Sequence, residues 1–334
     1  MAGDEFELIE AIRHHHEATG GTPPPDEVWI GDDAAVVAGE AGPLLLATDL
    51  VVAGVHTDPD VSSAADLGYK AMAVTVSDLA AMGARPRWAL VSVAGPPGSD
   101  PVALSAGVAD AAAELGCAVV GGDLSAAPAV TVSVAVAGVL VPAPPAGPGP
   151  LLRAGARAGD TLWLTGPLGS SAAGLRLARS ARSARSGGSG GSGGSGDTRA
   201  PAAALIAAHR RPRARVAEGE AARLAGASAA IDISDGLVAD ARHLAESSGV
   251  GLELAGVPVT DGATEAEALT GGEDYELLVA TADGPRLVAA FAASGLRPPV
   301  AIGVCTPDAG RHVLEGGPLP PGGWRHRFGT GGAG

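Results

Sequence analysis

The stretch Ile30-Gly31-Asp32-Asp33-Ala34-Ala35-Val36-Val37 places two adjacent carboxylates between apolar residues. Four later segments also put an aspartate at the end or in the middle of an apolar run, at 47–49, 76–79, 120–123 and 231–236. Burying a carboxylate is unfavourable unless it is paired, hydrogen-bonded or bound to a metal. Because few basic residues lie near these five segments, the pattern predicts that one set of cations serves all of them.

Magnesium is the cation that suits such a site. It is a hard ion that typically binds one or two carboxylates and fills its remaining positions with water and phosphate oxygens. The repeated aspartates therefore predict a site that handles phosphate groups.

The composition predicts a folded, acidic protein of two domains. The chain has 334 residues, of which 46% are apolar, which is enough for two separate cores. Its formal charge is −15, whereas surfaces that bind nucleic acid are usually basic, so we expect no nucleic-acid partner. Anionic ligands are still compatible with this charge, because bound metal ions invert the local sign.

Lys70 is the only lysine in the chain. Its position excludes the phosphate-binding loop Gly-x-x-x-x-Gly-Lys-Ser/Thr and the strand lysine of protein kinases. Any ATP chemistry in this protein must therefore follow another design.

Cysteine usage and the N-terminal residues predict a cytoplasmic protein. Cys117 and Cys305 are single thiols in apolar, strand-like contexts. Zinc or a disulfide is compatible with them, but such residues are more typical of reduced core cysteines. Residues 1–20 lack the basic start and apolar core of a signal peptide, and no apolar run reaches the length of a membrane span, so we expect no membrane partner.

The first half of the chain alternates between helix and strand signals. Residues 63–66 form a capping-box pattern that opens a helix ending near Gly83, and Asp78 lies inside it. The three histidines 14–16 point in different directions on a helix, which favours a solvated helix end over a metal site. The expected helices are 5–17, 63–83 and 101–116, and the expected strands are 44–52, 87–94, 118–120 and 130–136.

The second half begins after a Pro- and Gly-rich segment at 142–150, which we interpret as a linker between domains 1–141 and 151–334. Residues 186–196 are a Gly/Ser repeat, interpreted as a flexible surface insertion between helices. The turn at 234–236 precedes a helix, and a helix N-terminus is a favourable place for phosphate. The expected strands are 160–165, 229–233, 277–280 and one ending near 304, and the expected helices are one from about 170, 213–224, one through 247 and one ending near 294.

Taken together, the motifs resemble thiamine-monophosphate kinase, a family in the superfamily of aminoimidazole ribonucleotide synthetase and selenophosphate synthetase. Each motif is short, but seven occur in the family's order between Phe6 and about Phe328. They are Gly31-Asp32-Asp33-Ala34, Thr48-Asp49 with Gly54-Val55-His56, residues 77–84, Gly121-Gly122-Asp123, residues 169–175, residues 232–237 and residues 271–277.

The resemblance implies a fold and an activity. The fold is of the α/β (α+β) class, a two-domain synthetase-like fold with an N-terminal sheet-forming dimerisation domain and a C-terminal α/β domain. The implied activity is ATP-dependent phosphorylation of thiamine monophosphate to thiamine diphosphate with Mg²⁺, by direct in-line transfer in a homodimer.

The resemblance also implies roles for individual residues, and no catalytic acid or base is among them. The acceptor is already a phosphate oxygen anion, and phosphoryl transfer depends on positioning and charge stabilisation. The implied metal ligands are Asp33, Thr48, Asp49, Asp78, Asp123, Asp232 and Asp235. The implied ATP contacts are Gly122, Asp123, Arg153 and Ser234, and the implied contacts to thiamine monophosphate are His56, Glu273 and Trp324.

Two other functions share the aspartate pattern. One is another ATP-dependent synthetase of the same superfamily, and the other is a dimer that binds nucleotide without turnover. His56, Glu273 and Trp324 distinguish the kinase from the first, and the complete set of carboxylates argues against the second.

Shortening the Gly/Ser repeat at 186–196 to a few residues should leave stability and turnover nearly unchanged. The entropic cost of a flexible loop rises by only about 0.6 kcal/mol per doubling of its length. Thermal melting and turnover of the full and shortened chains check this. A large loss of either would mean that the segment docks on the protein.

Overall fold

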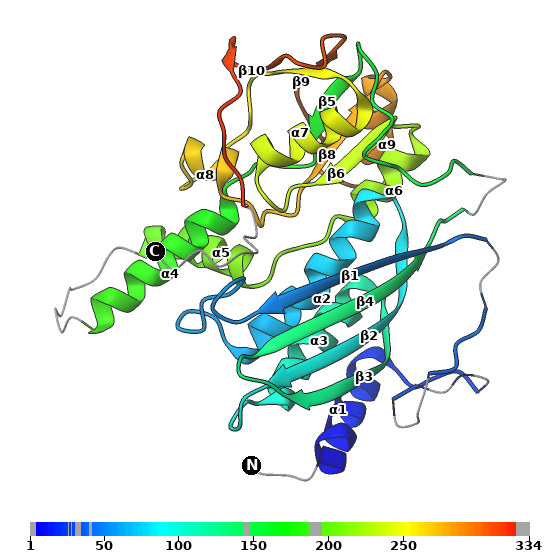
Figure 1. Ribbon diagram of the computed structural model, residues 1–334, viewed down its shortest axis with the longest axis vertical. Helices are drawn as coiled ribbons and strands as arrows, with labels where there is room; N and C mark the ends of the chain where they lie inside the picture. Colours follow the sequence, from blue (N-terminus) through cyan, green and yellow to red (C-terminus); the bar gives the residue numbers. More distant parts are fainter. Residues whose placement is uncertain are drawn as a thin grey trace.

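The computed structural model describes residues 5–25, 27, 29–30, 35–39, 42–142, 147–186 and 196–324. These residues form two β-sheets, each with its own helices, one above the other in Figure 1. Two predicted features lie outside the described residues: Asp33 with its motif at 31–34, and residues 187–195 of the Gly/Ser repeat. Within the described ranges, no helix is both long and apolar enough to cross a membrane.

The lower sheet follows the order β1-β4-β2-β3, so β1 and β3 are its two edges. Strand β4 runs antiparallel to both β1 and β2, whereas β3 runs parallel to β2. Figure 1 shows the β1 edge facing the upper sheet and the β3 edge far from it, beside α1. The bounds are β1 (Leu44–Val52), β2 (Arg85–Gly95), β3 (Ala118–Ala126) and β4 (Thr131–Val139).

Helices α2 (Ala64–Ala81) and α3 (Pro101–Leu115) cover one face of this sheet, and α1 (Glu5–Gly20) packs beside α3 (Figure 1). The predicted helix ends are confirmed. Ser63 and Asp66 form the capping box of α2, and Gly116 ends α3 in a left-handed conformation with φ 67°.

The two long helices approach closely because each presents a glycine to the other's backbone. A Cβ on Gly68 would lie 1.9 Å from the carbonyl oxygen of Leu104, and a Cβ on Gly107 would lie 1.8 Å from that of Ala65. No side chain fits at either position, so the pair fixes α2 against α3.

The upper sheet has the order β11-β10-β7-β9-β5-β8-β6 among the described residues. Its strands are β5 (Thr161–Leu164), β6 (Ala229–Asp232), β7 (Gly251–Leu254), β8 (Leu277–Thr281), β9 (Val300–Thr306), β10 (His312–Leu314) and β11 (Gly317–Pro318). Its helices are α4 (Ser170–Ser186), α5 (Gly196–Arg210), α6 (Val216–Leu224), α7 (Leu237–Ser248), α8 (Glu265–Thr270) and α9 (Gly284–Ala293). Helix α5 and the short elements β7, α8, β10 and β11 were not predicted, and the short ones carry too few residues to show a period.

One face of α2 joins the two halves. Lys70, Ser77 and Ala81 are spaced by seven and four residues, which puts them on the same side of a helix. Lys70 pairs with Glu273, Ser77 donates a hydrogen bond to Asp232, and Ala81 packs in an apolar cluster of the upper half. This face therefore positions the residues predicted for the site.

Two minor predictions have different outcomes. Both cysteines are free and buried, as predicted. The expectation of a solvated histidine cluster is wrong for His16, which is 9% exposed and 2.9 Å from the Ser105 hydroxyl. Burial lowers the pKa of His16 to about 4, because the protonated ring would lose its hydration.

Candidate functional site

Three predicted aspartates meet where β1, α2 and β6 come together. Asp49 lies on β1, Asp78 on α2 and Asp232 at the end of β6. Alternation along β1 turns Asp49 toward the helices, together with the buried Leu45 and Val51. Asp232 is 4% exposed, and its Oδ2 accepts a hydrogen bond of 2.6 Å from the Ser77 hydroxyl.

These three carboxylates disfavour one another's charge. Burial and then the charges of Asp232 and Asp49 raise the pKa of Asp78 to about 7. Burial and then Asp232 raise the pKa of Asp49, and burial raises that of Asp232. Arg153 is the cation that opposes the increase at Asp78 and Asp232. The cluster thus carries more negative charge than its basic neighbours neutralise.

Such a cluster fits cations, although it is not a preformed cage. In the described part of the chain, no three His, Cys, Asp or Glu side chains are grouped closely enough to hold one metal ion. Magnesium rarely needs such a cage, since it takes one or two carboxylates and keeps water or phosphate oxygens as its other ligands. The donor set therefore suits ions that arrive with a phosphorylated ligand.

The loop between β6 and α7 carries Ser234 and Asp235. Its backbone is held by Asp240, whose Oδ2 accepts hydrogen bonds of 3.0 Å from the N–H groups of Asp235 and Gly236. Asp240 is 2% exposed, and burial followed by the charges of Asp232 and Asp235 raises its pKa to about 8. Sequence reasoning missed Asp240, although a carboxylate in the apolar first turn of a helix after Ser-Asp-Gly was a usable signal.

Glu273 reaches this loop through backbone pairing. The Glu273 N–H donates to the Ser234 carbonyl at 2.8 Å, and the Tyr275 N–H donates to that of Ile233 at 2.9 Å. Ile233 and Ser234 directly follow β6, the strand that pairs with β8, so the two motifs meet as an extension of the β6–β8 pair. Glu273 has a left-handed φ of 58°, an uncommon conformation for a residue with a side chain.

His56 lies in the turn after β1. Its Nδ1 accepts a hydrogen bond of 3.0 Å from the Val52 N–H, so the neutral ring carries its proton on Nε2. Its carbonyl oxygen accepts from Lys70 Nζ at 3.0 Å, and the same ammonium lies 2.6 Å from Glu273 Oε1. Lys70 therefore links His56 to Glu273.

Trp324 is brought back to the same loop by the C-terminal segment. The backbone N–H of Trp324 donates to the Asp235 carbonyl at 3.0 Å. A Cβ on Gly323 would lie 2.4 Å from the Cβ of Ala239. The segment therefore packs closely on α7, while the Trp324 side chain is 52% exposed. The three residues predicted to contact the acceptor thus lie around one loop and one ammonium group.

The remaining predicted residues lie elsewhere on the lower sheet. Thr48 precedes Asp49 on β1, so its side chain points to the opposite face of the sheet, the open face that α2 and α3 do not cover. There its hydroxyl donates to the Val134 carbonyl at 3.0 Å. Asp123 is on β3, in register with Ser92, Ser133 and Leu50 across the sheet. Three strand spacings, about 14 Å in all, separate Asp123 from β1. One chain therefore does not bring Asp123 to the three-aspartate cluster.

Gly122 has a structural reason to be glycine. A Cβ there would lie 1.9 Å from the Val91 carbonyl oxygen on β2. A bulge precedes it, because Ala89 and Leu90 pair with Val119 and Gly121 and leave one residue of β3 over. The neighbouring strand, without any ligand, accounts for this glycine.

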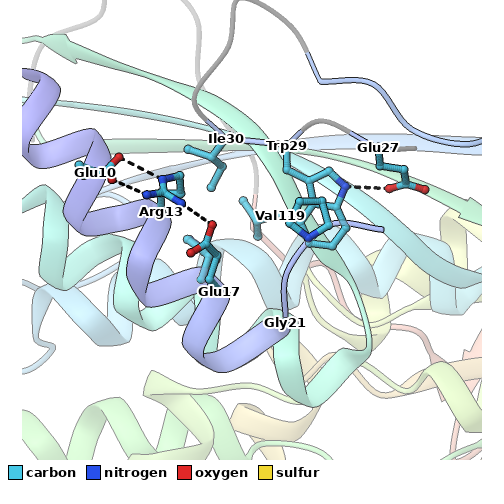
Figure 2. A pocket seen from close by; sticks show the side chains of 10 residues that line it. Glu10, Arg13, Glu17, Gly21, Glu27, Trp29, Ile30 and Val119 are labelled. Atoms are coloured by element: carbon cyan, nitrogen blue, oxygen red, sulfur yellow. Dashed lines mark hydrogen bonds and ion pairs between the residues drawn. The ribbon is translucent and has the colours of Figure 1, made fainter. Parts of the chain in front are cut away.

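Two hollows border the lower sheet. A groove of about 1200 Å³ runs over the open face and includes Thr48, Gly122 and Asp123. A smaller hollow of about 390 Å³ lies between α1 and a segment that contributes Gly21, Pro23, Glu27, Trp29 and Ile30 (Figure 2). In Figure 2, Arg13 pairs with Glu10 and Glu17, and the Trp29 indole donates to Glu27 at 2.7 Å. The smaller hollow contains none of the predicted site residues.

The raised pKa of Asp78 predicts how stability of the metal-free protein depends on pH. The folded state holds this proton more tightly than the unfolded state, so stability falls as pH rises from about 4 to about 7. Asp78→Asn removes the ionisation and should stabilise the metal-free chain by roughly 2–4 kcal/mol at about pH 8, with little effect near pH 4.

Urea unfolding without metal at both pH values measures this difference. Asp261→Asn, at an exposed position, is the matched control and should change stability by less than about 0.5 kcal/mol. An effect of Asp78→Asn that is equal at the two pH values would contradict the pKa assigned to this carboxyl.

Known families match most of the chain. A family described as AIR synthase related protein, N-terminal domain, matches residues 31–140, and its C-terminal counterpart matches residues 157–314. The chain is 36% identical over 290 residues to thiamine-monophosphate kinase of Salmonella typhimurium, covering 83% of this chain and 82% of that protein. It is 36% identical over 267 residues to thiamine-monophosphate kinase of Mycobacterium tuberculosis, covering 78% and 74%.

Solved structures agree with this relationship. Thiamine-monophosphate kinase of Stenotrophomonas maltophilia superposes with a TM-score of 0.76 at 30% identity, covering 95% of this chain and 98% of that one. The structure of AaThiL complexed with AMPPCP and TMP gives a TM-score of 0.72 at 32% identity, covering 97% of each chain. Two matching domains and relatives of this identity over most of both chains show that this chain belongs to the thiamine-monophosphate kinase family of AIR synthase-related proteins.

Proposed function

We propose that this protein transfers the γ-phosphoryl group of ATP to thiamine monophosphate. The observation that carries the proposal is the loop at 234–235, which lies between the aspartate cluster and the residues predicted to contact the acceptor. Asp235 is near Asp232 on one side, while Glu273 and Trp324 bond to the loop backbone. The related structure that contains AMPPCP and TMP supports the same two substrates.

The reaction forms one bond and breaks one. An oxygen of the acceptor's phosphate bonds to the γ-phosphorus, the bond from that phosphorus to the β–γ bridging oxygen breaks, and ADP leaves with the electron pair. Both reactants are anionic, so the site must supply positive charge and hold them in line. No protein base is required, because the attacking oxygen is already an anion.

The chain's own residues divide this work. Asp49, Asp78 and Asp232 would hold Mg²⁺, which when bound neutralises phosphate charge. Ser234 and Asp235 precede α7, where backbone N–H groups favour a phosphate or a metal–phosphate pair. Arg153 is exposed and near the cluster, so its guanidinium can reach a nucleotide phosphate.

We further propose that the active form is a homodimer joined through the open sheet face. This face exposes leucines on two strands, with Leu46 76%, Leu50 52% and Leu90 50% exposed. No described helix covers it (Figure 1). A second copy would bury these leucines and could bring its Asp123 to the cluster. Within a single chain, about 14 Å separate Asp123 from β1.

Leu46→Glu should convert the dimer to a monomer, because dimerisation would then bury an unpaired charge. Leu152→Glu is the matched control, since Leu152 is also 50% exposed but lies outside this sheet. Sedimentation velocity of both variants distinguishes the two outcomes. A monomeric wild type, or a dimeric Leu46→Glu variant, would contradict the proposed interface.

The assay of the function compares ATP consumption with and without thiamine monophosphate. We expect ADP and thiamine diphosphate in equal amounts, with both substrates and Mg²⁺ being required. Removing Mg²⁺ with a chelator should abolish turnover. The Asp78→Asn variant should show little turnover at limiting Mg²⁺, where the wild type is still active. ATP consumption that ignores thiamine monophosphate would indicate another synthetase, and none under any condition would indicate a protein that only binds nucleotide.

Trp324→Ala should raise KM for thiamine monophosphate about 5- to 30-fold and leave KM for ATP nearly unchanged. The reason is loss of an aromatic face for a flat, cationic ring, worth roughly 1–2 kcal/mol. Trp324→Phe keeps an aromatic face and should change KM for the acceptor far less. Equal changes in both KM values after Trp324→Ala would remove this residue from the acceptor site.

A further inference from the structure

Lys70 is a buried cation with two partners. Its side chain is 1% exposed, and a lysine is almost never buried to this degree unless it is paired. Its Nζ lies 2.6 Å from Glu273 Oε1 and donates to the His56 carbonyl at 3.0 Å. Both partners belong to the predicted acceptor site, and one lies in each half of the molecule.

A purely structural role is the alternative, and Arg223 shows what such a role looks like. Arg223 is 0% exposed and also joins the two halves. Its guanidinium donates to the carbonyl oxygens of Gly83, Val141 and Pro148. All of its partners are backbone groups. Lys70 instead pairs with a carboxylate that is 28% exposed and therefore available to a ligand.

Lys70 is the charged partner of Glu273 among the residues that the structure describes. His209 Nδ1 is 3.6 Å from Glu273 Oε2, and the same nitrogen is 3.0 Å from the Ser171 hydroxyl. Burial and then Lys70 itself lower the pKa of His209 to about 3, so the ring is neutral at physiological pH. The orientation of the Glu273 carboxylate thus depends on Lys70.

We propose that Lys70 is a positioning residue for the acceptor substrate: it holds the Glu273 carboxylate and the turn at His56 at a fixed separation across the junction. The inference rests on the proposed function. Lys70 does not touch the substrate, because its side chain is enclosed by protein. Without it, Glu273 can turn toward solvent and the His56 carbonyl loses its donor.

Because Lys70 is the only lysine, it can be observed directly in the unmodified protein. Protein labelled with ¹³C at lysine Cε gives a single side-chain signal from this residue. We expect thiamine monophosphate to shift the signal when it binds near Glu273, and AMPPCP alone to leave it nearly unchanged. No shift at saturating thiamine monophosphate, or an equal shift with AMPPCP alone, would overturn the proposal.

The kinetic test uses Lys70→Met with Arg223→Met as the matched control. Each replaces a buried cation between the two halves by an apolar chain of similar length, so both should lower the melting temperature. Lys70→Met should also raise KM for thiamine monophosphate about 10- to 100-fold, the range for losing a hydrogen bond to a charged group. KM for ATP should stay within about threefold. Arg223→Met should change neither KM by more than about threefold.

A double variant keeps the proposal testable if Lys70→Met alone does not fold. Lys70→Met combined with Glu273→Gln removes both charges, so no buried charge is left unpaired. If Lys70 acts chiefly through Glu273, KM of the double variant for thiamine monophosphate should lie within about threefold of that of Glu273→Gln alone, since only the donor to the His56 carbonyl is lost in addition. A further increase of tenfold or more would overturn the proposal.

The outcomes also separate this inference from the function on which it rests. A wild-type protein that does not phosphorylate thiamine monophosphate overturns both. A wild-type protein that does so, with Lys70→Met raising both KM values equally or neither, overturns the positioning role alone.

Discussion

The structure depends on the burial of one polar helix face between two sheets. Along that face of α2, Lys70 meets Glu273 and Ser77 meets Asp232 at 2.6 Å each. Buried polar groups are costly when unpaired, so each contact requires the other half of the molecule to be in place. The same contacts that join the two halves therefore align the predicted acceptor residues with the aspartate cluster.

The electrostatic design follows from an excess of carboxylates. The chain has a formal charge of −15, and its only lysine is enclosed in the junction. Asp49, Asp78 and Asp232 raise one another's proton affinity, with Arg153 as the opposing cation. In the proposed function, positive charge for phosphate binding would come largely from metal ions, and the site would become complete only when metal and nucleotide bind together.

The lower sheet has one covered and one open face, and this asymmetry matters for the site. Helices α2 and α3 bury the face that carries Asp49, while Thr48 and exposed leucines lie on the other. Asp123 lies at the edge far from the cluster. A sheet with such a face has apolar surface left to bury. In the proposed homodimer, a symmetric partner would cover this surface and would add residues to each site.

The sequence by itself determined the local features and the family. The sequence predicted the capping box at Ser63, the helix stop at Gly116 and the aspartates that follow apolar strands. These signals depend only on neighbouring residues. Only the tertiary structure decided which aspartates meet. Ser77 and Asp232 are 155 positions apart, and strand order alone separates Asp123 from Asp49. Lys70 and Asp240 acquire their roles through burial against distant segments, which no local pattern encodes.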